Sequence, residues 1–238
     1  MLDQLKIDVC DANRTLVDHD LVTLTWGNVS GIDRQSGRVV IKPSGVDYHD
    51  LLPEHMVVVD LDGNRIEGEL NPSSDTATHV WLYRSFPAIG GVTHTHSRYA
   101  TMYSQCRREI PCLGTTHADH FHGPVPVTRP LTESEVAQAY EANTGKVITE
   151  RFADLDPIAM PAVLVAGHAP FAWGPSAKKS VENAVALEAV AQMTLGCQQI
   201  MAGQQDNAVP RLEAYVLEKH YQRKHGPDAY YGQAKSSS

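Results

Sequence analysis

Two histidines separated by one residue, His94 and His96, follow a short β-branched run in the segment GGVTHTHSRYA, residues 90–100. On a β-strand, residues i and i+2 project from the same face, so two imidazoles with this spacing can reach one ion. Two strand histidines without any ligand would have the same spacing. A third histidine, His168, ends the apolar run PAVLVAG, and it favours a catalytic zinc site with three histidine ligands and an open position.

Polar turns that could bind an anion recur along the chain. The segment PSSD, residues 72–75, offers two hydroxyls at an expected helix N-terminus, where the helix dipole favours negative charge. Its Asp75 could ligate a metal or act beside one, although a plain helix N-cap would have the same sequence. The turns KPSG (42–45) and WGN (26–28) suggest, together with PSSD, a phosphate or polyol pocket. The candidate binding residues are Gly27, Asn28, Lys42, Ser44, Gly45, Ser73 and Ser74.

Two further segments carry groups that can transfer protons. GTTHADHFHG, residues 114–123, crowds Asp119 among three histidines, although a solvated loop would look alike. AYYGQ, residues 229–233, places two tyrosines beside a glycine. Such phenol rings usually dock on the body of the protein or on a neighbouring subunit, and a tyrosine can also donate a proton.

The hydrophobic pattern indicates the elements that must position these groups. Helical spacing predicts a first helix near the N-terminus, and glycine-punctuated β-branched runs predict strands over 21–45. The D-G-N turn predicts a hairpin over 55–68. Further helices are expected from Ser73 or Ser74 with Asp75 in the first turn, from a Thr132–Glu135 capping box to about Gly145, and over 176–203. The segment PAVLVAGHAPFAWG is expected to be one strand that runs into a loop, and the whole is a single α/β domain.

Composition limits the partners of this chain. A net charge of −8 over 238 residues argues against nucleic acid or an anionic membrane as the main partner. The four cysteines are scattered without a C-x-x-C pair, so neither a thiolate zinc site nor a disulfide framework is indicated. The first 20 residues mix charge through every turn and do not resemble a signal peptide, so we expect a cytoplasmic protein.

Taken together, these segments resemble the class II aldolase/epimerase family, and within it the enzymes that epimerise a pentulose phosphate. The matching blocks occur in family order and extend from Met1 to about Gln233. They are LVTLTWGNVS, VIKPSGVDY, PSSDT-THxxLY, IGGxxHTHSR, GTTHADxF, APFAWG and KHYxRKHGxxAYYGQ. His120 and His122 depart from the pattern, because the family more often has aromatic residues there.

The resemblance implies an α/β/α fold with a central, mainly antiparallel sheet, formed by one domain over residues 1–233 and followed by a mobile tail over 234–238. It implies a homotetramer with its sites at subunit interfaces, and a zinc ion as cofactor; histidine and carboxylate ligands also accept Mn²⁺ or Co²⁺. The implied metal ligands are Asp75, His94, His96 and His168. The phosphate and hydroxyls of the substrate would bind to the polar turns described above, and His220 would support the site. Asp119 and Tyr231 would be the acid/base pair, presented across a subunit interface.

The reaction implied is epimerisation of L-ribulose 5-phosphate to D-xylulose 5-phosphate at C4, by cleavage and re-formation of the C3–C4 bond. The fuculose- and rhamnulose-phosphate aldolases share the fold and metal, but typically have a glutamate at the position of Asp75. The shorter carboxylate here favours epimerisation, because a proton delivered to the enediolate carbon would release the fragments. A non-catalytic module such as the adducin head would have lost the metal ligands, which are all present. Amidohydrolase barrels and cupins also use His-x-His, but the mid-chain position of the pair and its following residues argue against both.

Overall fold

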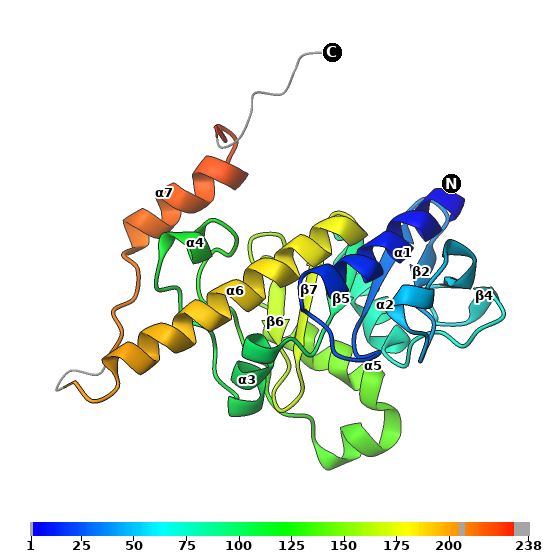
Figure 1. The fold of residues 1–238 in the computed structure, drawn as a ribbon, viewed down its shortest axis with the longest axis horizontal. Coiled ribbons are helices and arrows are strands. Elements are labelled where there is room, and N and C mark those ends of the chain that lie inside the picture. The colour runs from blue at the N-terminus through cyan, green and yellow to red at the C-terminus, as the bar shows by residue number, and fades with distance from the viewer. Residues whose placement is uncertain (1, 205–207, 231–238) are drawn as a thin grey trace.

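The structure is a computed structural model that describes residues 2–204 and 208–230. Its central feature is one antiparallel sheet (Figure 1). Its strands run in the order β4-β3-β2-β1-β5-β7-β6, and every neighbouring pair is antiparallel. The strands are β1 (Asn28–Asp33), β2 (Arg38–Ile41), β3 (Val57–Val59), β4 (Arg65–Glu67), β5 (Gly91–His94), β6 (Ala162–Leu164) and β7 (Pro170–Gly174). The predicted α/β class with a mainly antiparallel sheet is confirmed.

Helices cover both faces of this sheet, and the alternation of side chains along β1 shows which helix lies on which face. Ser30 faces α2 (Thr76–Ser85), where its Oγ lies 2.7 Å from His79 Nδ1 and 2.8 Å from the Tyr83 hydroxyl. Gly31 faces α1 (Leu2–Asp18), since a Cβ at this position would lie 2.9 Å from Leu5 Cδ1. The long helix α6 (Ala177–Met201) packs beside α1, and α5 (Glu133–Arg151) packs on α2.

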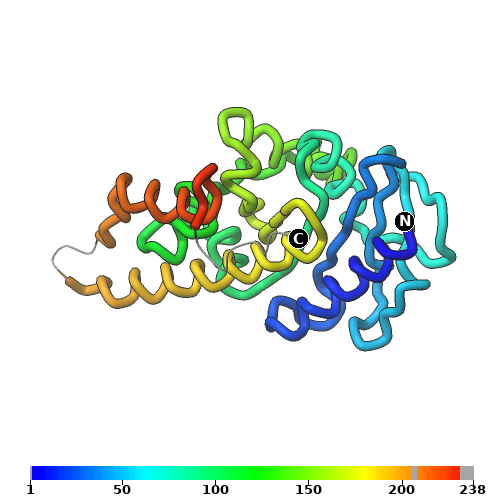
Figure 2. The backbone as a smooth tube through the Cα atoms, turned by 90° about the horizontal axis from the view of Figure 1, so that it is seen from above, coloured from blue at the N-terminus to red at the C-terminus, as the bar shows by residue number. Residues whose placement is uncertain are grey.

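The remaining helices extend the domain. Helix α3 (Arg98–Cys106) follows β5, and short 3₁₀ turns span Tyr48–Asp50 and Pro53–His55. Helices α4 (Thr115–Ala118) and α7 (Ala214–His225) lie together at one end of the molecule (Figures 1 and 2). No side chain of α7 is buried within the described chain. Among the described residues, no helix combines the length and apolar character that crossing a bilayer requires.

Three local predictions need correction. The run expected as one strand and a loop forms two strands, β6 and β7, joined by a turn that contains His168. Helix α2 begins at Thr76, so Asp75 is its N-cap and not part of its first turn. The capping box of Thr132 and Glu135 opens α5 as predicted, but the helix continues through Gly145 to Arg151.

Helix α5 passes Gly145 because this glycine allows close packing against α2. A Cβ at Gly145 would lie 2.6 Å from Trp81 Cβ, whereas nothing lies within 4 Å of a Cβ built at Gly196 in α6. Alanine favours a helix over glycine by about 1 kcal/mol when space permits. The glycine therefore serves packing and does not mark a helix end.

We expect Gly145→Ala to destabilise the protein by about 1–3 kcal/mol through overpacking against Trp81. The matched variant Gly196→Ala should instead raise stability by up to about 1 kcal/mol. Thermal unfolding followed by circular dichroism measures both changes. Equal melting shifts of the same sign in the two variants would contradict the packing role of Gly145.

Candidate metal centre and substrate cleft

The register between β1 and β5 brings the first site residues together, because Asn28 lies opposite His94. Strand β5 ends at His94, so His96 lies beyond the strand and reaches the site from the segment before α3. On the other side of β5, Phe171 of β7 lies opposite His94 and stacks on its ring, with centroids 4.1 Å apart. The β6–β7 turn adds His168.

The three predicted histidines converge. Their potential ligand atoms all lie within 4.8 Å of one another, and their ring centroids are 4.9–5.0 Å apart. His94 Nδ1 lies 2.9 Å from the Pro170 carbonyl, which can only accept, so Nδ1 carries a proton and Nε2 is the nitrogen that can offer a lone pair to a metal. Burial, together with the neighbouring His94 and His96, lowers the pKa of His168 to about 4. His168 is therefore neutral at neutral pH, the form that binds a metal.

The donor set fits a divalent cation. His168 Nδ1 is buried without a hydrogen-bond partner in the described chain, and a buried polar atom of this kind is costly unless a ligand satisfies it. Three imidazoles with an adjacent carboxylate are the donors that zinc and neighbouring transition metals prefer. The histidine set could therefore hold a metal ion.

Asp75 lies beside the three histidines in an unusual way for a helix N-cap. Its side chain makes no capping hydrogen bond to α2. Its Oδ2 instead accepts a hydrogen bond from Asn28 Nδ2 at 2.7 Å and lies 4.0 Å from His94 Nε2. Burial alone would raise the pKa of Asp75, but nearby His94 and the hydrogen bond from Asn28 lower it overall. The carboxylate is thus held ionised and directed toward the histidines.

A cleft of about 600 Å³ opens over this set. It is lined by all the predicted metal ligands and all the predicted binding residues of the polar turns: Gly27, Asn28, Lys42, Ser44, Gly45, Ser73, Ser74, Asp75, His94, His96 and His168. Five segments far apart in the sequence therefore meet at one place. The combination of donor nitrogens, hydroxyls and one buried ammonium suits a polar anionic ligand that also contacts a metal.

The floor of the cleft requires glycine at residue 27. Gly27 has a φ of +98°, and a Cβ there would lie 2.8 Å from the carbonyl oxygen of His94. The hydroxyl of the buried Tyr48 donates to the carbonyls of Gly27 at 2.7 Å and Trp26 at 3.0 Å. These contacts fix the turn against the end of β5.

Lys42 is a buried cation at the base of the same cleft. Its Nζ donates to the carbonyl of Val46 at 2.7 Å and to that of Pro43 at 3.3 Å, and it lies 4.8 Å from the centre of the Tyr48 ring. Burial lowers the pKa of Lys42 to about 8. The ammonium thus braces the turn at 44–45 and remains mostly charged at neutral pH.

The cleft contains wall residues that the sequence did not predict. Tyr140 and Glu141 of α5 and Trp26 of the WGN turn line it. Trp26 belongs to a turn that the sequence did single out, but no spacing or composition signal distinguishes Tyr140 and Glu141 from other residues of an amphipathic helix.

The predicted acid/base residue lies outside the cleft of its own chain. Asp119, at the end of α4, accepts hydrogen bonds from Arg223 Nη2 at 2.6 Å and is 3.1 Å from His220 Nδ1. Burial alone would raise the pKa of Asp119, but these hydrogen bonds and the charge of Lys224 hold it below its usual range. Neither Asp119 nor His220 lines the cleft. Tyr231 and the tail over 234–238 lie outside the described residues.

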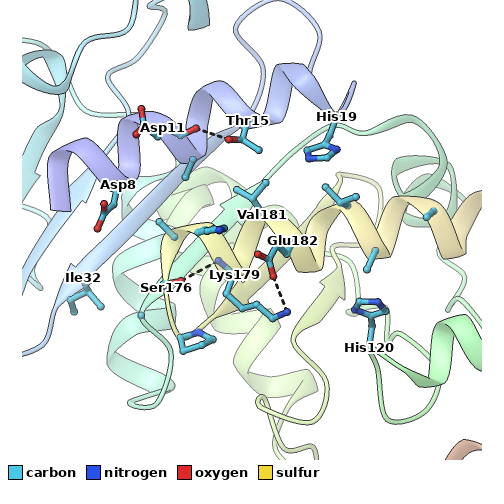
Figure 3. A pocket seen from close by; sticks show the side chains of 18 of the residues that line it. Asp8, Asp11, Thr15, His19, Ile32, His120, Ser176, Lys179, Val181 and Glu182 are labelled. Atoms are coloured by element: carbon cyan, nitrogen blue, oxygen red, sulfur yellow. Dashed lines mark hydrogen bonds and ion pairs between the residues drawn. The ribbon is translucent and has the colours of Figure 1, made fainter. Parts of the chain in front are cut away.

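A larger groove of about 950 Å³ runs between α1 and α6 (Figure 3). Its wall combines aliphatic side chains such as Val181 with an exposed Lys179–Glu182 ion pair, whose Nζ and Oε2 are 2.9 Å apart. His120 faces this groove from the turn that follows α4, and burial lowers its pKa to about 4. No predicted metal ligand or binding residue lines it, so the smaller polar cleft is the candidate site.

We expect His96→Asn to weaken metal binding at least about 100-fold, because it removes one of three imidazole ligands. Metal content after dialysis, measured by inductively coupled plasma mass spectrometry, checks this. The exposed His49 offers a matched control, and His49→Asn should retain the metal. A His96→Asn protein that keeps its full metal content would remove His96 from the ligand set.

Comparisons with known proteins identify the family of this chain. Residues 7–195 match the family described as Class II Aldolase and Adducin N-terminal domain. The L-ribulose-5-phosphate 4-epimerase UlaF of Salmonella paratyphi B is 51% identical over 232 residues, covering 98% of this chain and 100% of that protein. Among solved structures, an L-fuculose 1-phosphate aldolase superposes with a TM-score of 0.76 at 25% identity, covering 92% of this chain and 95% of the other. The L-fuculose-1-phosphate aldolase of Thermus thermophilus gives 0.67 at 24% identity, with coverages of 85% and 100%. This chain therefore belongs to the class II aldolase family.

Proposed function

We propose that the protein is a metal-dependent L-ribulose-5-phosphate 4-epimerase, which interconverts L-ribulose 5-phosphate and D-xylulose 5-phosphate. The observation that carries the proposal is a single cleft in which three histidines and Asp75 adjoin three polar turns. Full-length similarity at 51% identity to a protein named for this activity supports the same substrate.

In this proposal His94, His96 and His168 hold the cation, with Asp75 at or beside it, and Zn²⁺ is the expected ion with Mn²⁺ or Co²⁺ as alternatives. A divalent cation in this place supplies Lewis-acid stabilisation of the negative charge that develops on substrate oxygen. Asn28 keeps Asp75 directed toward the histidines through its 2.7 Å hydrogen bond.

The polar turns bind the phosphate and hydroxyls of the sugar. The hydroxyls and backbone N–H groups of Ser44, Ser73 and Ser74 provide donors, and Gly27 and Gly45 let the backbone approach closely. Lys42 adds positive charge from below the turn that it braces. A phosphate anchored in this way stays in place while the rest of the molecule changes configuration.

The chemistry follows from the position of the carbon that inverts. The hydrogen on C4 is not adjacent to the C2 carbonyl, so simple deprotonation at C4 is unfavourable. In the retro-aldol route, the C4 hydroxyl loses its proton, the C3–C4 bond breaks, and its electron pair moves onto the C2–C3 unit as an enediolate. C4 becomes the aldehyde of glycolaldehyde phosphate. This aldehyde rotates, the C3–C4 bond re-forms on its opposite face, and the new C4 alkoxide receives a proton.

Two groups are needed for the proton transfers, one on each face of the aldehyde, and we assign them to Asp119 and Tyr231. Asp119 is held ionised by Arg223 and its neighbours, so it suits the role of proton acceptor. Its distance from the cleft of its own chain and the lack of buried side chains on α7 support a homotetramer in which each cleft is completed by a neighbouring subunit. His220, bonded to Asp119, would position that carboxylate.

We also propose that residues 1–233 form a single catalytic domain and that the protein is located in the cytoplasm.

The direct test of the proposed activity is incubation of the purified, metal-loaded protein with L-ribulose 5-phosphate. We expect D-xylulose 5-phosphate as the product. Accumulation of dihydroxyacetone and glycolaldehyde phosphate instead, or turnover only with fuculose or rhamnulose 1-phosphate, would identify an aldolase and contradict the proposal.

We expect Asp119→Asn to lose most epimerase turnover, about 100-fold or more, because an amide cannot accept the C4 hydroxyl proton. Its metal content should stay at the wild-type level, since Asp119 lies away from the histidines. As a control, Asp62→Asn removes an exposed carboxylate from the β3–β4 turn and should leave turnover unchanged. Full activity of Asp119→Asn would remove Asp119 from the reaction.

A further inference from the structure

Helix α5 is broken where it passes the candidate site. Ala139 has φ −162° and ψ 74°, far from helical values, although neither proline nor glycine is present in this turn. A break of this kind interrupts the regular helical hydrogen bonds, so other groups must pair with the backbone atoms that it frees. The two residues that follow it, Tyr140 and Glu141, are the residues of α5 that line the cleft.

Side-chain hydrogen bonds support this break from both sides. Asn143 Nδ2 donates to the carbonyl of Glu135 at 2.8 Å, an acceptor that a regular helix would offer to the N–H of Ala139. Thr78 of α2 donates through Oγ1 to the carbonyl of Glu141 at 2.6 Å. The break is therefore held by α2, whose N-cap Asp75 contributes to the site. The fold thus determines the position of Tyr140.

An aromatic ring lies beside each of two site histidines, His168 and His96. The Tyr140 ring lies 6.0 Å from that of His168, and the Trp26 ring lies 6.4 Å from that of His96. Trp26 is 53% exposed although it is a large apolar side chain, and Tyr48 fixes its backbone through the carbonyl oxygen. The accessible indole ring of Trp26 therefore forms part of the lining of the cleft.

The proposed reaction makes a demand that these two rings can meet. After the C3–C4 bond breaks, an epimerase must retain both fragments until the aldehyde has rotated. If water delivers a proton to C3, the enediolate becomes dihydroxyacetone, the bond cannot re-form at once, and glycolaldehyde phosphate leaves. Apolar walls that exclude water from C3 suppress this loss.

We propose that Tyr140 is a specificity-determining residue that retains the cleaved fragments, with Trp26 as a second aromatic residue in the lining of the cleft. This inference rests on the proposed epimerase function and extends it. Tyr140 acts through its ring, which shields the side of the cleft at His168. Loss of the ring opens the cleft to water and converts part of the epimerase flux into aldol cleavage.

The test measures how each variant partitions L-ribulose 5-phosphate between D-xylulose 5-phosphate and released dihydroxyacetone, in D₂O and with metal-loaded protein. We expect Tyr140→Ala to raise the ratio of released to epimerised product at least about 10-fold. The released dihydroxyacetone should carry deuterium on the carbon that was C3 of the substrate. Tyr140→Phe keeps the ring and should stay within about 2-fold of wild type. Val136→Ala alters an exposed position of the same helix and should leave the ratio unchanged.

Two further variants keep the test decisive if Tyr140→Ala misfolds or loses metal. Tyr140→Leu retains an apolar side chain of smaller area, and Trp26→Ala removes the second aromatic ring of the cleft at an exposed position. Both variants should increase release. A wild-type ratio in metal-replete Tyr140→Ala or Tyr140→Leu would overturn the role of Tyr140. Release by Tyr140→Phe equal to that of Tyr140→Ala would also overturn it, because the hydroxyl and not the ring would then matter. Absence of epimerisation in wild-type protein would instead refute the proposed function.

Discussion

The pairing of β1 with β5 is the constraint on which the candidate site depends. Its register places Asn28 opposite His94, and Asn28 then directs Asp75 toward the histidine ring. Because side chains alternate along a strand, a shift of one residue would move His94 to the opposite face of the sheet. Thr93 occupies that face, where its hydroxyl lies 2.7 Å from Ser180 Oγ of α6. The register is also fixed at Gly91, where a Cβ would lie 2.4 Å from backbone atoms of the α6 N-terminus.

Three features beside the cleft make the local structure less stable than regular elements would be. Asp75 occupies the N-cap position of α2 without making the side-chain hydrogen bond that would stabilise the helix by about 1 kcal/mol. Helix α5 loses regular geometry at Ala139. Lys42 is buried at a cost that shows as a pKa lowered to about 8. All three departures surround the same cleft, as expected where function and not folding selects the residues.

Much of this site could be predicted from the sequence because its chemistry is local. The spacing of His94 and His96 and the serine-rich turns identify donors without reference to the fold, and the structure brings all of them to one cleft. The way in which the fold brings these residues together could not be predicted from their spacing. His96 lies beyond its strand, and His168 sits in a hairpin because Pro170 begins a new strand, a position that proline tolerates.

Other features could not be read from the sequence for physical reasons. The break in α5 has no proline or glycine to signal it, so the position of Tyr140 at the site depends on a tertiary hydrogen bond from Thr78 of α2 and on one from Asn143 within α5. Gly145 resembles a helix end, but it is required by the proximity of Trp81. Asp119 lies outside the cleft of its own chain, and its proposed role requires an assembly of several copies, which no local pattern of residues encodes.

The most direct test of the central claim, inversion of C4 through cleavage and re-formation of the C3–C4 bond, is an NMR measurement in D₂O. Metal-loaded protein is incubated with L-ribulose 5-phosphate, and the hydrogen on C4 of the product is observed. We expect D-xylulose 5-phosphate that retains protium at C4, since the retro-aldol route never breaks the C4–H bond. Deuterium at C4 would show that inversion proceeds by deprotonation and would contradict the claim.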